Sequence, residues 1–106
     1  MSKLVRDKIP DIIRARGGQP VTRVADDAES RQRLIDKPAE EAGEVRDADG
    51  LHRAGELADV LEVVFALAEH DGLSRDDLEK LREAKAAERG GFAGRIIWSG
   101  NLERGE

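Results

Sequence analysis

Two groups of carboxylate side chains in the middle of the chain have spacings that could hold a metal ion. The first is Glu40-Glu41-x-x-Glu44 and the second is Glu56-x-x-Asp59. Residues three or four apart on a helix are surface neighbours, so the members of each group would share one helix face. If the chain turns back between the two groups, the helices run antiparallel and the carboxylates converge between them.

The second group borders an apolar stripe rather than the solvated side of its helix. At roughly 100° per residue, Glu56 and Asp59 fall on one flank of this stripe, whereas Glu62 points to solvent. Carboxylates beside a core repel one another and lose hydration, and a divalent cation offsets both effects. Cys is absent, and His52 and His70 are the only histidines. The expected ion is therefore the oxygen-preferring Mg²⁺ or Mn²⁺.

The competing interpretation is a solvated acidic face. Charged residues make up 39% of the chain, and a Glu-rich helix is more often exposed to water than part of a ligand site. Each motif is weak by itself, and the stronger signal is the pair on consecutive helices beside a core stripe. The basic residues could equally be solvated, but cations beside a carboxylate–metal cluster are what a polyphosphate substrate requires.

Length and charge limit the classes of protein to which this chain can belong. The 106 residues predict one domain, over 1–106, with so modest a core that another subunit covers part of its apolar surface. The net charge of −5 argues against binding to a nucleic-acid backbone. No apolar run approaches the roughly 20 residues that span a bilayer, and no signal-peptide segment follows the first residues. We therefore expect a cytoplasmic protein without a membrane or nucleic-acid partner.

Helices dominate the expected secondary structure. Apolar periodicity and capping residues predict helices over 8–16, from Asp26-Asp27 to about 48, over 51–70 and from 74 to about 89. A turn is expected at Asp49-Gly50. The fold class is therefore all-α, as an antiparallel helical bundle that assembles into oligomers.

Two local features modify this pattern. Pro38 interrupts the second helix, and its ring would clash with a carbonyl one turn earlier, which predicts a break or kink near Lys37. Residues 95–98 fit a short strand that could pair with the β-branched stretch 20–25.

Three parts of the sequence together resemble the MazG-like all-α nucleoside triphosphate pyrophosphohydrolases, and among them the phosphoribosyl-ATP pyrophosphohydrolase-like subgroup. They are the two carboxylate motifs, the opening Lys3-Leu4-Val5-Arg6-Asp7-Lys8-Ile9-Pro10, and the close Lys85-Ala86-Ala87-Glu88-Arg89-Gly90-Gly91-Phe92 with Arg95-Ile96. The likeness covers residues 3 to about 97. It departs at Pro38, where the subgroup usually has an apolar, helix-compatible residue.

The resemblance implies a Mg²⁺-dependent hydrolysis in which water attacks a phosphorus of a nucleoside triphosphate, or of phosphoribosyl-ATP, to give the monophosphate and pyrophosphate. It implies that the metal ligands are Glu41, Glu44, Glu56 and Asp59. Glu40 would be an outer ligand or would position or deprotonate the water, so that the catalytic residues are Glu40 and Glu41. The implied phosphate-binding residues are Lys3, Arg6, Lys8, Lys37, Lys85 and Arg89.

House-cleaning of non-standard nucleotides, by a homodimer or homotetramer, is the biological role that the resemblance implies. The alternative from another class is a non-catalytic helical module that binds a nucleotide or a protein partner.

Overall fold

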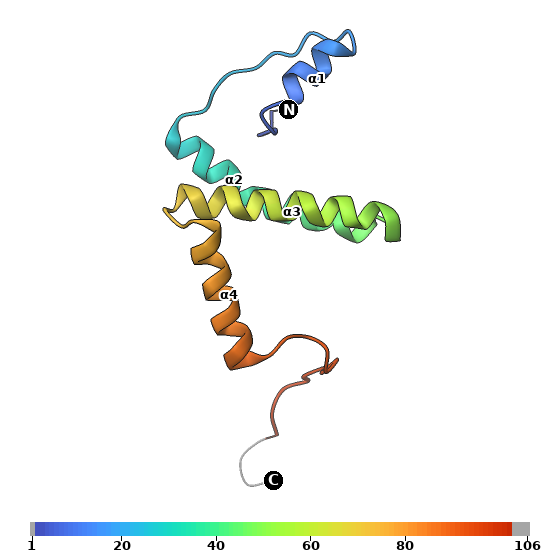
Figure 1. Ribbon diagram of the computed structural model, residues 1–106. Coiled ribbons are helices and arrows are strands. Elements are labelled where there is room, and N and C mark those ends of the chain that lie inside the picture. Colours follow the sequence, from blue (N-terminus) through green and yellow to red (C-terminus); the bar gives the residue numbers. More distant parts are fainter. Residues whose placement is uncertain (1, 103–106) are drawn as a thin grey trace. The chain divides into compact units, whose positions relative to one another are not determined.

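The computed structural model describes residues 2–102, and four helices are the regular elements of this range. They are α1 (Ile9–Ala15), α2 (Asp27–Asp47), α3 (Gly50–His70) and α4 (Arg75–Arg89), as Figure 1 shows. The all-α prediction is confirmed. None of these helices is long and apolar enough to cross a bilayer. The chain divides into two compact units, one up to Arg75 and one from Asp76 onward.

The hairpin of α2 and α3 forms the centre of the first unit, and the two helices pack along each other. Asp26 caps α2 by accepting a hydrogen bond of 2.9 Å from the backbone N–H of Glu29. Asp49 caps α3 by accepting from the backbone N–H of His52. Since only Ala48 and Asp49 separate the helices, α3 returns antiparallel along α2 (Figure 1). The predicted turn is confirmed.

Pro38 lies inside α2 without ending it, so a helix break near Lys37, one of the two predicted outcomes, is wrong, and a kink there stays a prediction. One α-helix runs from Asp27 to Asp47. The reason is tertiary packing. Leu34 and Glu41, about one turn to either side of the proline, are both buried in the hairpin, and such burial overrides local helix propensity.

The two segments expected to pair as strands are irregular, and the predicted two-stranded element is wrong. Within residues 2–102, neither 20–25 nor 95–98 contains a strand. The side chains of Val21, Val24 and Ile96 are exposed, and Arg95 has a φ of 58°, which interrupts an extended backbone. β-Branched residues favour strands only where a pleated, half-buried surface receives them, and the two segments lie in different compact units.

The apolar core of the described range is small. Leu34 and Ala68 are its buried apolar residues, and Glu41 is its buried charged residue. Leu57 and Leu61, two members of the apolar stripe of α3, remain half exposed. The hairpin therefore presents apolar surface that the described chain leaves uncovered.

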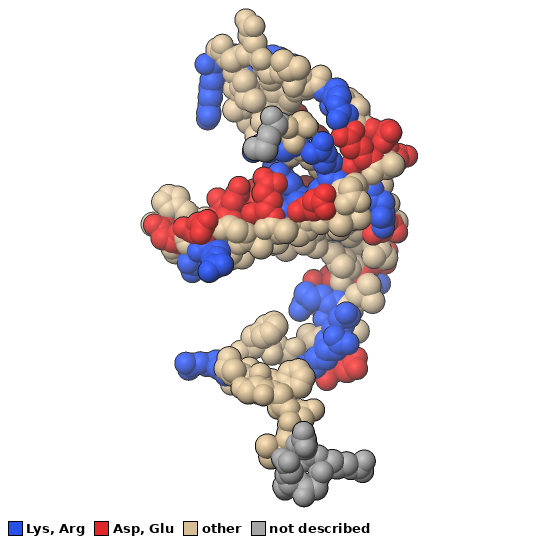
Figure 2. Space-filling view, turned by 180° about the vertical axis from the view of Figure 1, so that it is seen from behind, with Lys and Arg blue, Asp and Glu red and all other residues tan. Residues whose placement is uncertain are grey.

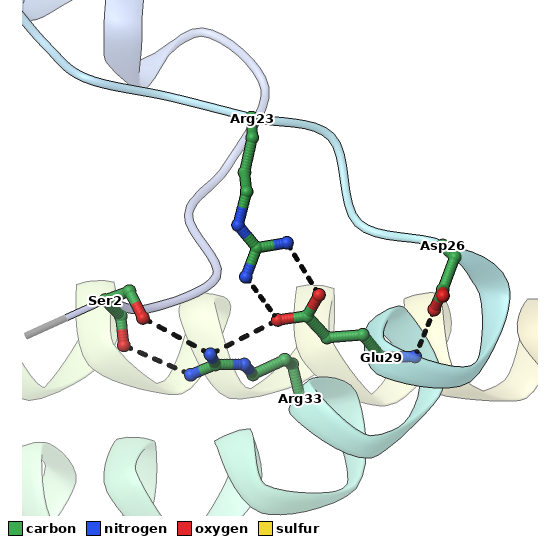
Figure 3. Close-up of polar contacts among 5 residues, drawn as sticks. All are labelled: Ser2, Arg23, Asp26, Glu29 and Arg33. Atoms are coloured by element: carbon green, nitrogen blue, oxygen red, sulfur yellow. Dashed lines mark hydrogen bonds and ion pairs between the residues drawn. The ribbon is translucent and has the colours of Figure 1, made fainter.

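A network around Glu29 ties residues 2–26 to α2 (Figure 3). Arg23 donates two hydrogen bonds of 2.7 Å to the Glu29 carboxylate, and these hydrogen bonds are the main cause that lowers the pKa of Glu29 to about 2. Arg33 donates to Glu29 at 3.3 Å, to the backbone oxygen of Ser2 at 3.1 Å and to its Oγ at 3.3 Å. Both ends of the segment that contains α1 are thereby held on the N-terminal half of α2.

In the second unit, α4 ends at the predicted glycine pair, and Gly90 has a φ of 80°, a conformation that glycine adopts without strain. The segment that follows contains Trp98, the only tryptophan of the chain. Its side chain is 76% exposed, and its Nε1–H donates a 3.1 Å hydrogen bond to Oδ1 of Asn101.

Candidate metal centre

Three carboxylates from the facing sides of α2 and α3 meet in the hairpin. Glu41 belongs to α2, while Glu56 and Asp59 belong to α3, and one oxygen from each lies within 4.8 Å of the other two. Glu41 shares the face of Leu34 because seven residues are about two helical turns. The expectation that the two motifs converge after the turn is met for these three side chains.

Burial distinguishes this cluster from an ordinary acidic surface. Glu41 is only 7% exposed. The Oε2 atoms of Glu41 and Glu56 are buried, and neither has a hydrogen-bond partner among residues 2–102. A buried carboxylate oxygen without a partner is unfavourable, and a coordinated cation would satisfy it. Because all donors are carboxylate oxygens, the residues present fit Mg²⁺ or Mn²⁺.

The pKa values of Glu41 and Glu56 are both raised. Burial is the main cause of the raised pKa of Glu41, and the negative charge of Glu44 adds to it. The pKa of Glu56 is raised first by a hydrogen bond with the carboxyl group of Glu44 and then by burial. Glu44 is exposed and lies beside the triplet rather than within it. A divalent cation would compete with protons for these groups, since metal ligation requires the deprotonated form.

Two of the basic side chains that the resemblance implies as phosphate-binding residues contact carboxylates of this region. The Nη1 of Arg6 lies 2.9 Å from the Oδ1 of Asp59. The Nζ of Lys37 lies 3.4 Å from a Glu40 oxygen and 3.8 Å from a Glu41 oxygen. Figure 2 shows Lys and Arg side chains interspersed with the carboxylates along the hairpin. The cluster is therefore partly neutralised by the protein itself.

The structure places the other predicted phosphate-binding residues differently. Lys3 lines a cavity of about 510 Å³ that also includes Lys37 and Glu40. Lys8 is the N-cap of α1 and contacts none of the clustered carboxylates in the described range. The remaining two, Lys85 and Arg89, lie on α4, mostly within the second compact unit. Only part of the predicted basic set is thus brought to the carboxylates within the first unit.

Arg33 is a residue of this region that the sequence analysis missed. Its guanidinium lines the same cavity as Lys3 and Lys37 while it is hydrogen-bonded to Ser2. The signal that could have found it is spacing, because Arg33 lies four residues before Lys37 and therefore on the same face of the helix. A shallow depression lies at the turn between α2 and α3, and its lining includes Glu44 and Glu56.

The comparisons with known proteins leave the family open. No family model matches the chain, and no solved structure matches it. The chain is 49% identical over 49 residues to an uncharacterized protein of Mycolicibacterium smegmatis, a match that covers 46% of this chain and 50% of that protein. The chain thus spans about half the length of this curated relative.

Proposed function

We propose that the protein is a Mg²⁺-dependent nucleotide pyrophosphohydrolase of the MazG-like all-α class, which hydrolyses a nucleoside triphosphate or phosphoribosyl-ATP to the monophosphate and pyrophosphate. The observation that carries this proposal is the pair of buried, unpartnered oxygens on Glu41 and Glu56, in one cluster with Asp59. Such a cluster suits a hard divalent cation, and Arg6 and Lys37 beside it suit the phosphates that the cation would accompany.

In this mechanism Glu41, Glu56 and Asp59 would hold the ion, and the neighbouring Glu44 would supply a further carboxylate. When bound, Mg²⁺ supplies neutralisation of the polyphosphate charge and a more acidic water. Glu40 orients the attacking water and accepts its proton as the water oxygen attacks a phosphorus of the substrate. The bond from phosphorus to the bridging oxygen then breaks, and the pyrophosphate leaves with the bonding electron pair. Lys37, within 3.4 Å of Glu40, stabilises the charge that develops on the leaving group.

The functional unit that we propose is a homodimer or homotetramer. The support is the half-exposed apolar stripe of α3, with Leu57 and Leu61 uncovered, in a chain whose buried core is so small. A second copy of the hairpin would cover this stripe. Sedimentation of the protein as a monomer alone at micromolar concentration would contradict this part of the proposal.

The decisive experiment measures pyrophosphate release. The protein is incubated with Mg²⁺ and a panel of nucleoside triphosphates that includes non-standard bases, with phosphoribosyl-ATP as a further substrate, and phosphate is detected after addition of a pyrophosphatase. We expect hydrolysis of at least one substrate, abolished by EDTA and by Asp59→Asn. House-cleaning of nucleotides in the cytoplasm is the role that we propose if non-standard bases are preferred.

Glu69→Gln is the matched control, because Glu69 is an exposed carboxylate of α3 that is outside the cluster. It removes the same charge and should retain full activity. If wild type hydrolyses none of the substrates although Mn²⁺ stabilises it, the non-catalytic binding module becomes the better interpretation.

A further inference from the structure

The N-terminal residues cross the α2–α3 hairpin as a strap that is anchored at both ends. At one end, Ser2 accepts two hydrogen bonds from Arg33 of α2 (Figure 3). At the other, Arg6 contacts Asp59 at 2.9 Å and Glu62 at 3.9 Å, both on α3. The strap, residues 2–6, is therefore fixed relative to the carboxylate cluster although it forms no regular element.

The strap and α2 together line the half-open cavity of about 510 Å³. Its lining is Ser2, Lys3, Leu4, Arg33, Asp36, Lys37 and Glu40. Three of these side chains are cationic and two are anionic, and only one is apolar. The three cations in one lining favour an anionic ligand.

The three cations differ in what already holds them. Arg33 is oriented by Ser2 and by Glu29, so it is held in place before any ligand arrives. Lys3 makes no ion pair with any described residue and is available to an anion. Lys37, whose side chain is only 16% exposed, is shared between Glu40 and Glu41. Of the three cations, Arg33 is therefore held in place, Lys3 is available to a ligand, and Lys37 is paired with carboxylates.

We propose that this strap cavity binds the terminal diphosphate of the substrate, through Lys3, Arg33 and Lys37, and retains it as the leaving pyrophosphate. The inference rests on the proposed function for its choice of diphosphate among anions. Glu40 is common to the cavity lining and to the carboxylate motif, so an anion here lies next to the groups that would act on the substrate.

Lys37 couples the strap cavity to the carboxylate cluster. While Glu41 is negatively charged, its oxygen lies 3.8 Å from the Nζ of Lys37 and competes with any anion for that charge. Neutralising Glu41, by a metal ion or by substitution, leaves Lys37 to the cavity. Anion affinity should therefore rise when Glu41 is neutralised and should respond less to neutralisation of Glu44, for which no contact with Lys37 is found in residues 2–102.

The test is calorimetric titration of metal-free protein with inorganic pyrophosphate at low ionic strength, after EDTA treatment and its removal. We expect binding by wild type and an affinity about fivefold weaker in Lys3→Ala, as for the loss of one partly exposed charge-assisted contact. The matched control is Lys80→Ala, which removes the same charge from α4 outside the cavity and should change the affinity less than twofold.

A second pair of variants tests the coupling. Glu41→Gln and Glu44→Gln remove the same charge from neighbouring positions, and we expect Glu41→Gln to bind pyrophosphate at least about threefold more tightly than Glu44→Gln. Equal affinities of Lys3→Ala and Lys80→Ala, or absence of wild-type binding at millimolar pyrophosphate, would overturn the strap cavity as the binding site. Equal affinities of the two glutamine variants would overturn the coupling.

These titrations contain neither metal nor a hydrolysable nucleotide, so their result can refute the strap cavity without refuting the proposed function. Hydrolysis that does not depend on Lys3 would refute the strap cavity alone. Pyrophosphate binding in the expected order, without hydrolysis of any substrate, would refute the proposed enzyme and leave an anion site.

Discussion

Glu41→Gln should stabilise the metal-free protein and weaken its response to metal. The substitution preserves the shape of the most buried member of the cluster and removes its repulsion with Glu56 and with Asp59. Each repulsion acts between oxygens that lie within 4.8 Å, where two unit charges repel by about 0.9 kcal/mol even in water. Loss of the 3.8 Å contact with Lys37 offsets up to about 1 kcal/mol. We therefore expect the free energy of unfolding at pH 7 to increase by about 1 kcal/mol.

Mn²⁺ should stabilise Glu41→Gln less than it stabilises wild type. An ion present at one hundred times its dissociation constant stabilises the native state by about 2.7 kcal/mol, which corresponds to a rise in Tm of roughly 10–20 °C for a domain of this size. Glu41→Gln loses the most buried oxygen ligand, so its Tm should rise by less than about half as much at the same Mn²⁺ concentration.

The assay is thermal unfolding followed by far-UV circular dichroism, with EDTA and with Mn²⁺, on wild type, Glu41→Gln and the surface control Glu69→Gln. The control should behave as wild type in both conditions. Equal Mn²⁺ shifts in wild type and Glu41→Gln would refute the metal centre. A metal-free Glu41→Gln protein that is less stable than wild type would refute the repulsion on which the magnitude rests.

Three further outcomes are expected. The pKa values of Glu41 and Glu56 are raised above the ordinary value of 4.5, so the stability that these groups contribute is present at low pH and lost as pH rises through their folded-state pKa. In urea titrations, metal-free protein should therefore gain stability from these two groups as pH falls from neutral toward 4.5. Pro38→Ala should raise the free energy of unfolding by up to about 3 kcal/mol, also by urea titration, and an unchanged midpoint would contradict it. Arg6→Ala should tighten Mn²⁺ binding about threefold in low-salt calorimetry, because Arg6 competes for Asp59; weaker binding would show that Arg6 supports the site instead.

The helices could be predicted from the sequence because their signals are local. The apolar period of α3 and the caps at Asp26 and Asp49 depend on residues within a few positions. The effect of Pro38 could not be predicted in the same way. Whether α2 continues past Pro38 depends on the packing of its residues Leu34 and Glu41 against α3, which is a contact between distant parts of the chain. The β-branched stretches failed for a related reason, since strand propensity is realised only where a partner strand is present.

For the carboxylate cluster, the sequence predicted which residues share a helix face, but it did not predict their burial or their contacts with other segments. Spacing and the turn were sufficient to bring Glu41 to Glu56 and Asp59. The sequence contained no signal that Glu44 would stay at the exposed side. Nor did it indicate that Arg6 would reach a residue 53 positions away, because contacts made by an irregular segment follow no period.

The position of Trp98 determines what the intrinsic tryptophan fluorescence of this protein reports. The chain's only indole belongs to the second compact unit and is largely exposed, so its emission should lie near that of tryptophan in water whether or not the helical hairpin is folded. Intrinsic fluorescence is consequently sensitive to anything that covers the C-terminal segment. A blue shift of the emission maximum as protein concentration rises would thus be an optical signature that Trp98 enters an interface.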